Sequence, residues 1–369
     1  MPTPSVQLAP SFQQQDVQFH RAFGIVREAI EKRAFPGASI AVTIDGRLLV
    51  WKAIGRFTYD PESPSVSPTT IYDLASLSKA IATTTMAMIL VERGALRLDD
   101  QVGQYLPQFV VDKDVRRKEV TIRMLLAHSS GLPAYEKLFL HAVTRDELVA
   151  GTMQAPLVAD PGTVTEYSDL GFILLGELLS KVADESLDRF SDREIFDPLG
   201  MAGARFVPPP QWATQIPPTE DDINFRHRII QGEVNDENSS VMGGISGHAG
   251  VFGSALDVAT FAHCVLNGGS PIVKAETIAM FTRRETTPTK TSRALGWDTP
   301  SAPSQSGKLF GPRSYGHLGF TGTSLWCDPD RKLSVTLLTN RTWPDRSSQE
   351  IKRVRPIIHD AILEAIGEQ

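Results

Sequence analysis

The sequence predicts a mixed α/β (α+β) fold in which an antiparallel sheet, flanked by helices, carries an inserted and mostly helical domain. Two β-rich runs lie near the N-terminus and two more lie near the C-terminus. The long stretch between them has mostly helical patterns of apolar residues. We therefore expect one domain from residues 1–75 and 285–369, a helical domain from residues 76–284, and a functional site in the cleft between them.

An amphipathic helix and a hairpin are predicted first along the chain. Between residues 13 and 33, the apolar side chains recur at a helical spacing, with Phe19, Phe23 and Val26 among them. Two β-rich runs at 38–43 and 48–53 then flank an Asp-Gly pair, which is typical of a tight hairpin turn. Residues 59–70 are rich in Pro and Ser and predict a surface loop.

A buried helix is predicted next, because small and apolar residues continue for several turns before Gly94. Ser76 lies at or just inside its N-terminus, and Lys79 follows three residues later. The later elements are expected at the following positions: helices from 96 (ended by Pro107), at 121–128, 145–153, 172–182, 255–266 and 347–366, and strands at 325–327 and 333–339.

The composition is that of an ordinary globular chain and argues against several classes of protein. The 369 residues are 41% hydrophobic and 22% charged, with a net charge of −6. No basic run with interleaved aromatic residues occurs, so we expect no nucleic-acid partner. Two cysteines, Cys264 and Cys327, indicate buried thiols rather than a disulfide framework. The sequence gives no sign of an oligomeric state.

The N-terminal residues have neither a basic region nor an apolar region of the kind found in a signal peptide. We therefore expect no membrane span and a cytoplasmic location, or a periplasmic one if a leader has been removed. The acidic stretch 233–238 lacks the alternating ligands and central Gly of a calcium loop. Accordingly, we expect neither a metal nor a cofactor.

Ser76 and Lys79 together can support nucleophilic chemistry. Positions i and i+3 share one face of a helix, so the hydroxyl and the amine can touch. The helix N-terminus adds free N–H groups and a partial positive charge, both of which stabilise developing negative charge. On its own, however, the Ser-x-x-Lys spacing more often indicates an N-cap serine beside a solvated lysine.

Two later motifs favour the chemical interpretation. Tyr167-Ser168-Asp169 precedes an apolar helical run, and Gly316-His317-Leu318-Gly319-Phe320 precedes a strand. Ser-x-x-Lys, Tyr-x-Asn/Asp and Lys/His-x-Gly in this order resemble the serine β-lactamase and penicillin-binding-protein superfamily. The tyrosine of the second motif is similar to that of class C β-lactamases, D-alanyl-D-alanine carboxypeptidases and family VIII carboxylesterases. The resemblance extends from about residue 35 to about residue 366.

This resemblance implies a β-lactamase/transpeptidase-like fold and an acyl-enzyme mechanism. Ser76 would be the nucleophile, and Lys79 or Tyr167 would remove its proton. The backbone N–H groups of Ser76 and Phe320 would form the oxyanion hole. Asp169, His317 and Gly319 would lie in the substrate-binding part of the site.

Two residues depart from the common pattern. Asp169 replaces the usual Asn, and we expect it to pair with Lys79 and keep it protonated, which favours Tyr167 as the base. His317 replaces the Lys of β-lactamases, and a histidine that is mostly neutral near pH 7 attracts a substrate carboxylate less strongly.

The leading hypothesis is a serine hydrolase that acts on a small ester, amide or short peptide. A D-alanyl-D-alanine carboxypeptidase or weak β-lactamase is one alternative, and a non-catalytic binding protein with the same fold is another. His128, at a helix end, is expected to be structural more often than chemical. The glycine-dense run 243–253 around His248 predicts close backbone packing beside the cleft. Neither the sequence pattern nor the resemblance indicates the acyl or leaving-group preference.

Overall fold

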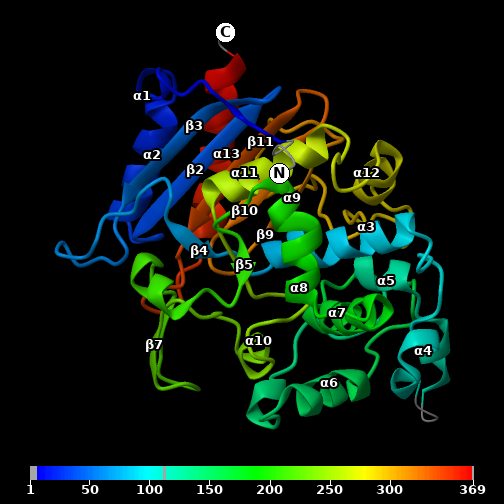
Figure 1. Cartoon of the computed structure of the whole chain (residues 1–369). Coiled ribbons are helices and arrows are strands. Elements are labelled where there is room, and N and C mark those ends of the chain that lie inside the picture. Colours follow the sequence, from blue (N-terminus) through cyan, green and yellow to red (C-terminus); the bar gives the residue numbers. More distant parts are fainter. Residues whose placement is uncertain (1–5, 111–113, 368–369) are drawn as a thin grey trace.

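A six-stranded sheet is the central feature of the computed structural model, which describes residues 6–110 and 114–367 (Figure 1). Its strand order is β1-β3-β2-β11-β10-β9, and every neighbouring pair is antiparallel except β1 with β3. The sheet joins both ends of the chain, which confirms the predicted fold class. Residues 1–5 and 368–369 of the expected sheet domain lie outside the described residues. The strands are β1 (Ala9–Pro10), β2 (Gly37–Ile44), β3 (Arg47–Gly55), β9 (Tyr315–Leu318), β10 (Ser324–Asp328) and β11 (Leu333–Thr339).

The predicted hairpin is confirmed by β2 and β3. Asp45 and Gly46 form its turn with φ values of 44° and 79°. Two successive residues with positive φ suit a tight hairpin turn, and Asp-Gly adopts this conformation readily.

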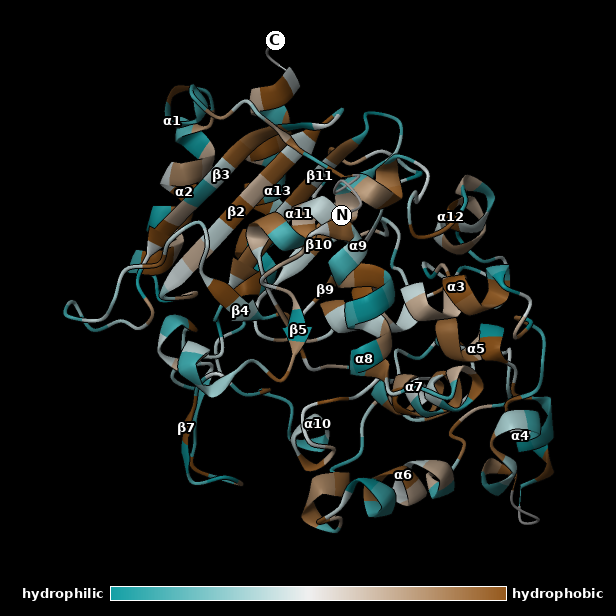
Figure 2. Cartoon of the chain, in the orientation of Figure 1, coloured by the Kyte–Doolittle hydropathy of each residue, from teal (hydrophilic) through white to brown (hydrophobic). Residues whose placement is uncertain are grey.

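Helices cover both faces of the sheet. On one face, α2 (His20–Glu31) and α13 (Glu350–Gly367) pack side by side, and their apolar residues share a core with Ile40 and Val42. On the other face, α11 (Ala255–Leu266) packs on β2, β10 and β11, and the intervening Ala41 belongs to this second core. Successive strand residues therefore face opposite cores. Figure 2 shows the resulting hydrophobic colouring of β2 and β3.

The helical part is built around α7 (Asp169–Ala183), whose residues 170–176 are all buried. Helix α7 contacts the π-helix η1 (Lys79–Thr84), α3 (Thr85–Glu92), α5 (Ile122–Leu126) and α6 (Arg145–Gln154). Gly176 meets Gly247 so closely that a Cβ on Gly176 would lie 2.8 Å from the Gly247 Cα. The division into two domains stays a prediction, because α11 belongs to the expected helical domain but packs on the sheet.

The remaining elements connect these two parts. Two small sheets occur: β4-β8-β5 and the hairpin β6-β7. The helix expected from residue 96 begins only at Val102, because the Asp100 carboxylate accepts the Arg97 N–H and forms a turn instead. The bounds are β4 (Ile71–Asp73), β5 (Arg205–Phe206), β6 (Glu220–Asp222), β7 (Arg228–Ile230), β8 (Val251–Ser254), α1 (Gln15–Gln18), α4 (Val102–Tyr105), α8 (Leu187–Ser191), α9 (Asp197–Leu199), α10 (Glu237–Val241) and α12 (Ala275–Thr282).

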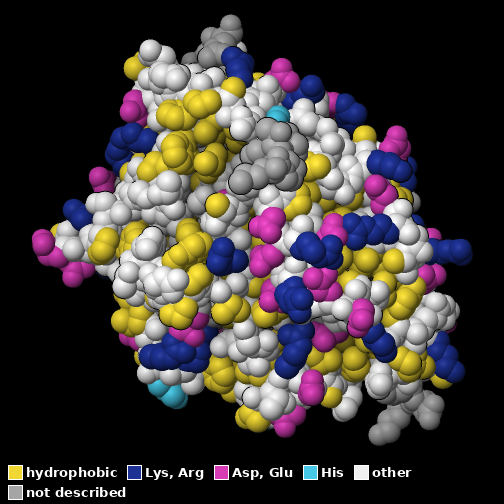
Figure 3. Space-filling model, in the orientation of Figure 1, with side chains coloured by type: hydrophobic (Ala, Val, Ile, Leu, Met, Phe, Trp, Pro, Cys, Tyr) yellow, Lys and Arg dark blue, Asp and Glu magenta, His cyan; other side chains and the backbone are white. Residues whose placement is uncertain are grey.

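The surface carries charges of both signs. Figure 3 shows Lys and Arg side chains interspersed with Asp and Glu over one face of the molecule. Within residues 6–110 and 114–367, we find no helix with the length and apolar character that a membrane span requires. Cys264 and Cys327 are free and buried. Burial raises the pKa of the Cys264 thiol to about 12 and also raises that of Cys327.

Candidate active site

Ser76 lies in a turn between β4 and the helical stretch 77–92. The preceding residue, Ala75, has φ +47°, a conformation that costs a residue with a side chain some energy. The buried Asp73 holds it there, because its Oδ1 accepts the Ala75 N–H at 2.8 Å and its Oδ2 accepts the Asn235 N–H at 2.7 Å. The turn therefore places Ser76 at a defined position, as expected for the N-terminal end of a buried helix.

Lys79 is fully buried one turn beyond Ser76 and makes two hydrogen bonds and one ion pair. Its Nζ donates to the Ser76 Oγ at 2.9 Å and to the His248 carbonyl at 2.9 Å, and it pairs with the Asp169 carboxylate at 2.7 Å. A hydroxyl, a carbonyl and a carboxylate thus surround the ammonium. Burial by itself lowers the pKa of Lys79, but Asp169 and then Tyr167 outweigh burial and raise it. Lys79 is therefore protonated at neutral pH.

The segment containing Lys79 is a π-helix, which the sequence did not predict. Thr85 Oγ1 donates back to the Ala80 carbonyl five residues earlier, at 3.1 Å. Thr83 Oγ1 donates across to the Gly247 carbonyl at 2.7 Å. Single π turns are often found at functional sites. Here the π turn fixes Lys79 against the loop that contains His248.

Tyr167 and Asp169 flank the N-cap of α7. The N-cap itself is Ser168, whose Oγ accepts the Gly171 N–H at 3.0 Å. The Lys79 Nζ lies 5.0 Å from the centroid of the Tyr167 ring. Burial raises the pKa of Tyr167, although Lys79 opposes this shift. The structure thus brings Ser76, Lys79, Tyr167 and Asp169 together, with the phenol protonated at neutral pH.

The third motif lies across the cavity from α7, at the end of β9. Thr321 and Thr323 donate their hydroxyls to the carbonyls of Asp73 and Leu74, at 2.8 and 2.9 Å. A Cβ on Gly319 would lie 2.6 Å from the Leu74 carbonyl oxygen, so only glycine fits. These contacts attach the motif to the turn before Ser76. In the described part of the chain, the N–H groups of Ser76 and Phe320 have no acceptor, as an oxyanion hole requires.

His317 is buried and lines the same cavity. Its Nδ1 donates to the Leu318 carbonyl at 2.8 Å, and its Nε2 is buried with no partner among the described residues. Burial, with Lys79 and Arg293 nearby, lowers the pKa of His317 to about 3. The ring is therefore neutral and offers a hydrogen-bond acceptor at Nε2 instead of a positive charge.

Two other histidines support the motifs through hydrogen bonds. His128 Nδ1 accepts the Ser168 N–H at 3.0 Å, and its ring lies 4.5 Å from the Tyr167 ring. Burial lowers the pKa of His128 well below its usual value, so this residue acts as a neutral acceptor. His248 contributes the carbonyl that accepts a hydrogen bond from Lys79.

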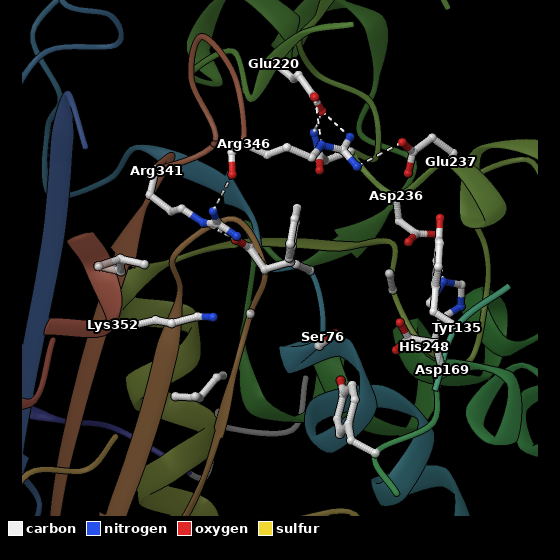
Figure 4. Close-up of a pocket in the computed structure, with 18 of the residues that line it drawn as sticks. Ser76, Tyr135, Asp169, Glu220, Asp236, Glu237, His248, Arg341, Arg346 and Lys352 are labelled. Atoms are coloured by element: carbon white, nitrogen blue, oxygen red, sulfur yellow. Dashed lines mark hydrogen bonds and ion pairs between the residues drawn. The ribbon is translucent and has the colours of Figure 1, made fainter. Parts of the chain in front are cut away.

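A cavity of about 1090 Å³ is lined by Ser76, Tyr167, Asp169, His248 and His317. Figure 4 shows Ser76 between Asp169 and His248 on one side and Lys352 on the other. Near the rim, Arg346 pairs with Glu220 and Glu237, and the Phe320 ring lies 4.3 Å from the Arg341 guanidinium. Among the described residues, no group of three His, Cys, Asp or Glu side chains is arranged to hold a metal ion.

Sequence reasoning missed the residues of this rim. Tyr135, Arg341, Arg346 and Lys352 line the cavity, and Arg293 lies 5.3 Å from the Tyr167 ring. They come from loops and from the start of α13, where neither periodicity nor a motif distinguishes them. The glycine-dense run around His248 and the acidic stretch 233–238 were the signals near this region.

Known proteins resemble the chain over almost its whole length. A Salmonella agona (strain SL483) protein provisionally named D-alanyl-D-alanine carboxypeptidase is 32% identical over 88% of this chain and 83% of its own. An Escherichia coli K12 protein with the same provisional name is 32% identical over 83% of this chain and 79% of its own.

Solved structures share the fold. EstCE1, described as a hydrolase with promiscuous acyltransferase activity, has a TM-score of 0.78 at 23% identity, covering 94% of this chain and 99% of its own. A class C β-lactamase from Rhodobacter sphaeroides has a TM-score of 0.72 at 23% identity, with coverages of 94% and 99%. The family profile described as Beta-lactamase matches residues 23–357. With Ser-x-x-Lys, Tyr-x-Asp and His-x-Gly meeting in one cavity, the chain belongs to the β-lactamase family of serine hydrolases.

Proposed function

We propose that this enzyme hydrolyses a small carboxylic ester or amide through an acyl-enzyme formed on Ser76. The observation that carries the proposal is the position of Lys79, whose ammonium contacts both the Ser76 Oγ and the Asp169 carboxylate. A nucleophile held by a charged neighbour beneath a large cavity suits acyl transfer. The proposed substrates are esters, amides or short peptides that fit the cavity.

In the proposed reaction, the reactive form is the one in which the Tyr167–Lys79 pair has lost one proton. Asp169 keeps the remaining proton on Lys79, so the Tyr167 phenolate accepts the Ser76 proton as Oγ attacks the substrate carbonyl. The N–H groups of Ser76 and Phe320 stabilise the oxyanion. Protonated Tyr167 then donates to the leaving group, and water releases the acyl group by the reverse route.

The experiment is turnover of p-nitrophenyl acetate and butyrate by the wild type and by Ser76→Ala. We expect the variant to lose hydrolysis by at least about 10⁴-fold, because removing a nucleophile disables a coupled site. Intact mass spectrometry after penicillin treatment should show one adduct on the wild type and none on the variant. Undiminished ester turnover by Ser76→Ala would contradict the nucleophile assignment.

A second candidate is a D-alanyl-D-alanine carboxypeptidase or weak β-lactamase, whose substrates carry a carboxylate. Three cations lining the cavity favour it: Lys352, Arg341 and Arg355 have no acidic partner among the described residues. Arg341 and Arg355 donate only to carbonyl groups. The neutral ring of His317 favours ester hydrolysis instead, because it places no positive charge beside Ser76 to attract a substrate carboxylate. Turnover of nitrocefin and a D-alanyl-D-alanine peptide, set against the two esters, separates the candidates.

A further inference from the structure

The His248 carbonyl, which accepts a hydrogen bond from Lys79, belongs to a loop that presents consecutive carbonyl groups. Gly247 accepts from Thr83 at 2.7 Å, His248 accepts from Lys79 at 2.9 Å, and Ala249 accepts from Ser239 at 3.1 Å. A Cβ on Gly247 would lie 2.0 Å from the Phe172 carbonyl oxygen, so the loop backbone packs directly on α7. The position of this loop therefore determines where the ammonium of Lys79 lies.

The ring of His248 holds the loop in place. It is 1% exposed, its Nε2 is 2.7 Å from Asp236 Oδ1, and its Nδ1 is 2.8 Å from Ser246 Oγ. These three residue types also occur in hydrolytic triads. Ser246 is itself only 1% exposed, and the two ring nitrogens have exchanged partners relative to a triad. The cluster is therefore not a second nucleophile, and its role is to hold the backbone.

Asp236 lies on the wall of the cavity and connects several parts of the site. Its Oδ1 also accepts the Ser239 N–H at 2.7 Å, which caps α10. Although burial opposes it, His248 lowers the pKa of Asp236 to about 2, and Lys79 adds to this effect. The carboxylate is therefore ionised at working pH, and its charge favours the ammonium form of Lys79.

The neighbouring residue, Asn235, supports the nucleophile in the same way. Its backbone N–H donates to Asp73 Oδ2 at 2.7 Å, and Asp73 Oδ1 accepts the Ala75 N–H immediately before Ser76. The adjacent residues Asn235 and Asp236 are thus each connected to one member of the Ser76–Lys79 pair. One reaches the serine through Asp73, and the other reaches the lysine through His248.

We propose that Asp236 and His248 are positioning residues for Lys79, and that the Asn235–Asp236 pair sets the distance between Lys79 and Ser76. This inference rests on the proposed function, because it assigns Lys79 a part in the reaction. Neither residue needs to contact the substrate. The acidic stretch and the histidine that remained without a role in the sequence thereby acquire one together.

The test compares Asp236→Ala and His248→Ala with the wild type in p-nitrophenyl butyrate hydrolysis as a function of pH. We expect kcat to fall about 10-fold to 100-fold while KM changes less than about threefold, because misplacement of a catalytic group mainly affects the chemical step. The alkaline limb of the kcat profile should move to lower pH, because in both variants the carbonyl of residue 248 is displaced from Lys79, and Asp236→Ala also removes a nearby negative charge. The His248→Gln side chain can still reach Asp236, so this variant should recover part of the wild-type kcat and part of the wild-type pH of the alkaline limb.

His359→Ala is the matched control, because His359 is also fully buried but lies on α13, hydrogen-bonded to Ser306 and Ser324. It should lose stability without moving the limb. The inference would be overturned if the alkaline limb of the kcat profile stayed at the same pH in Asp236→Ala and His248→Ala. It would also be overturned if the limb moved by the same amount in His359→Ala.

The Lys79 pKa, measured by NMR of the lysine side chain, gives a readout that needs no turnover. The other titratable or charged groups near Lys79 are Asp169, Tyr167, His128 and His317, and all of them stay unchanged in these variants. A lowered Lys79 pKa in both variants supports the positioning role even if Ser76→Ala retains ester turnover. An unchanged Lys79 pKa refutes the positioning role whatever the rates are.

Discussion

Lys79 and Lys352 serve the same cavity in opposite ways. Lys79 is fully buried and contacts a hydroxyl, a carboxylate and a carbonyl. Lys352 is exposed, lines the cavity, and has no acidic partner in the described part of the chain. The floor of the site (Ser76, Lys79, Tyr167 and Asp169) therefore holds its charges as a buried ion pair, whereas Lys352 at the rim is exposed and can meet a ligand.

We expect this difference between Lys79 and Lys352 to separate catalysis from substrate selection. A buried charge with all its hydrogen bonds satisfied is costly to disturb and holds its neighbours in place. An exposed lysine contributes little to stability and acts through attraction that salt screens. Changes at the floor should thus affect every substrate, and changes at the rim should affect only some. The following predictions test this division in order of decreasing effect.

Lys79→Met should have the largest effect. We expect kcat to fall by about 10⁴-fold for ester and peptide substrates alike, because the cation that helps hold Ser76 and Tyr167 is lost. Lys352→Met serves as the matched control and should leave ester turnover unchanged. Steady-state kinetics on p-nitrophenyl butyrate measures both, and similar losses in the two variants would remove the distinction between floor and rim.

We expect the Phe320 N–H to act in the oxyanion hole, whereas the Phe320 ring lies at the rim, so two substitutions can separate these roles. Phe320→Pro removes the N–H, and we expect kcat to fall about 10²-fold to 10³-fold, as for the loss of one oxyanion-hole donor. Phe320→Ala keeps the N–H and should change kcat less than about threefold. Melting temperatures confirm that both variants are folded, and equal kcat values would exclude the N–H from the oxyanion hole.

Asp169→Asn keeps the shape of the floor but removes its negative charge. In the wild type, the folded-state pKa of Lys79 is raised, so its charge stabilises the fold below about pH 10, and this stability is lost as the pH rises further. Without Asp169, we expect burial to outweigh Tyr167 and to lower the pKa of Lys79 below its unfolded value. The variant should then lose about 3 kcal/mol at pH 7 and become more stable as the pH rises.

Urea unfolding at pH 7 and pH 9.5 measures this reversal. The alkaline limb of ester hydrolysis should also move to lower pH in Asp169→Asn, because Lys79 loses its proton more readily. If stability has the same pH slope in both proteins, Asp169 does not keep Lys79 charged.

Lys352→Met should have the smallest effect and should depend on the substrate. For a substrate with a free carboxylate, we expect KM to rise about threefold to fivefold, as for the loss of an exposed ion pair. The neutral ester should be unaffected. Lys332→Met, on the exposed pair with Asp45, is the control for a general charge effect. Equal KM changes for the charged and neutral substrates would contradict a selective role for Lys352.

The floor could be predicted from the sequence because its residues have local signatures. Ser76 and Lys79 are one helical turn apart, and Tyr167 and Asp169 flank the N-cap serine of α7. The strands of the sheet could also be predicted, because β-rich runs and an Asp-Gly turn are local sequence patterns.

The rim and the loop around His248 could not be predicted in the same way. Arg346 reaches Glu220 across 126 residues, and no periodicity encodes such a pair. His248 supports Lys79 through its carbonyl, a group that every residue has, so its side chain gave no indication of this contact. The π turn at Lys79 also depends on contacts with the Gly247 loop rather than on local preference.

The burial of both cysteines has a practical consequence. Because Cys264 and Cys327 are the only two in the sequence and both thiols are inaccessible with raised pKa values, maleimide reagents should leave the wild type unlabelled. A single thiol introduced by Lys352→Cys would then be the sole attachment point for a fluorescent dye. Such a labelled protein would report cavity occupancy directly, even for ligands that are never turned over.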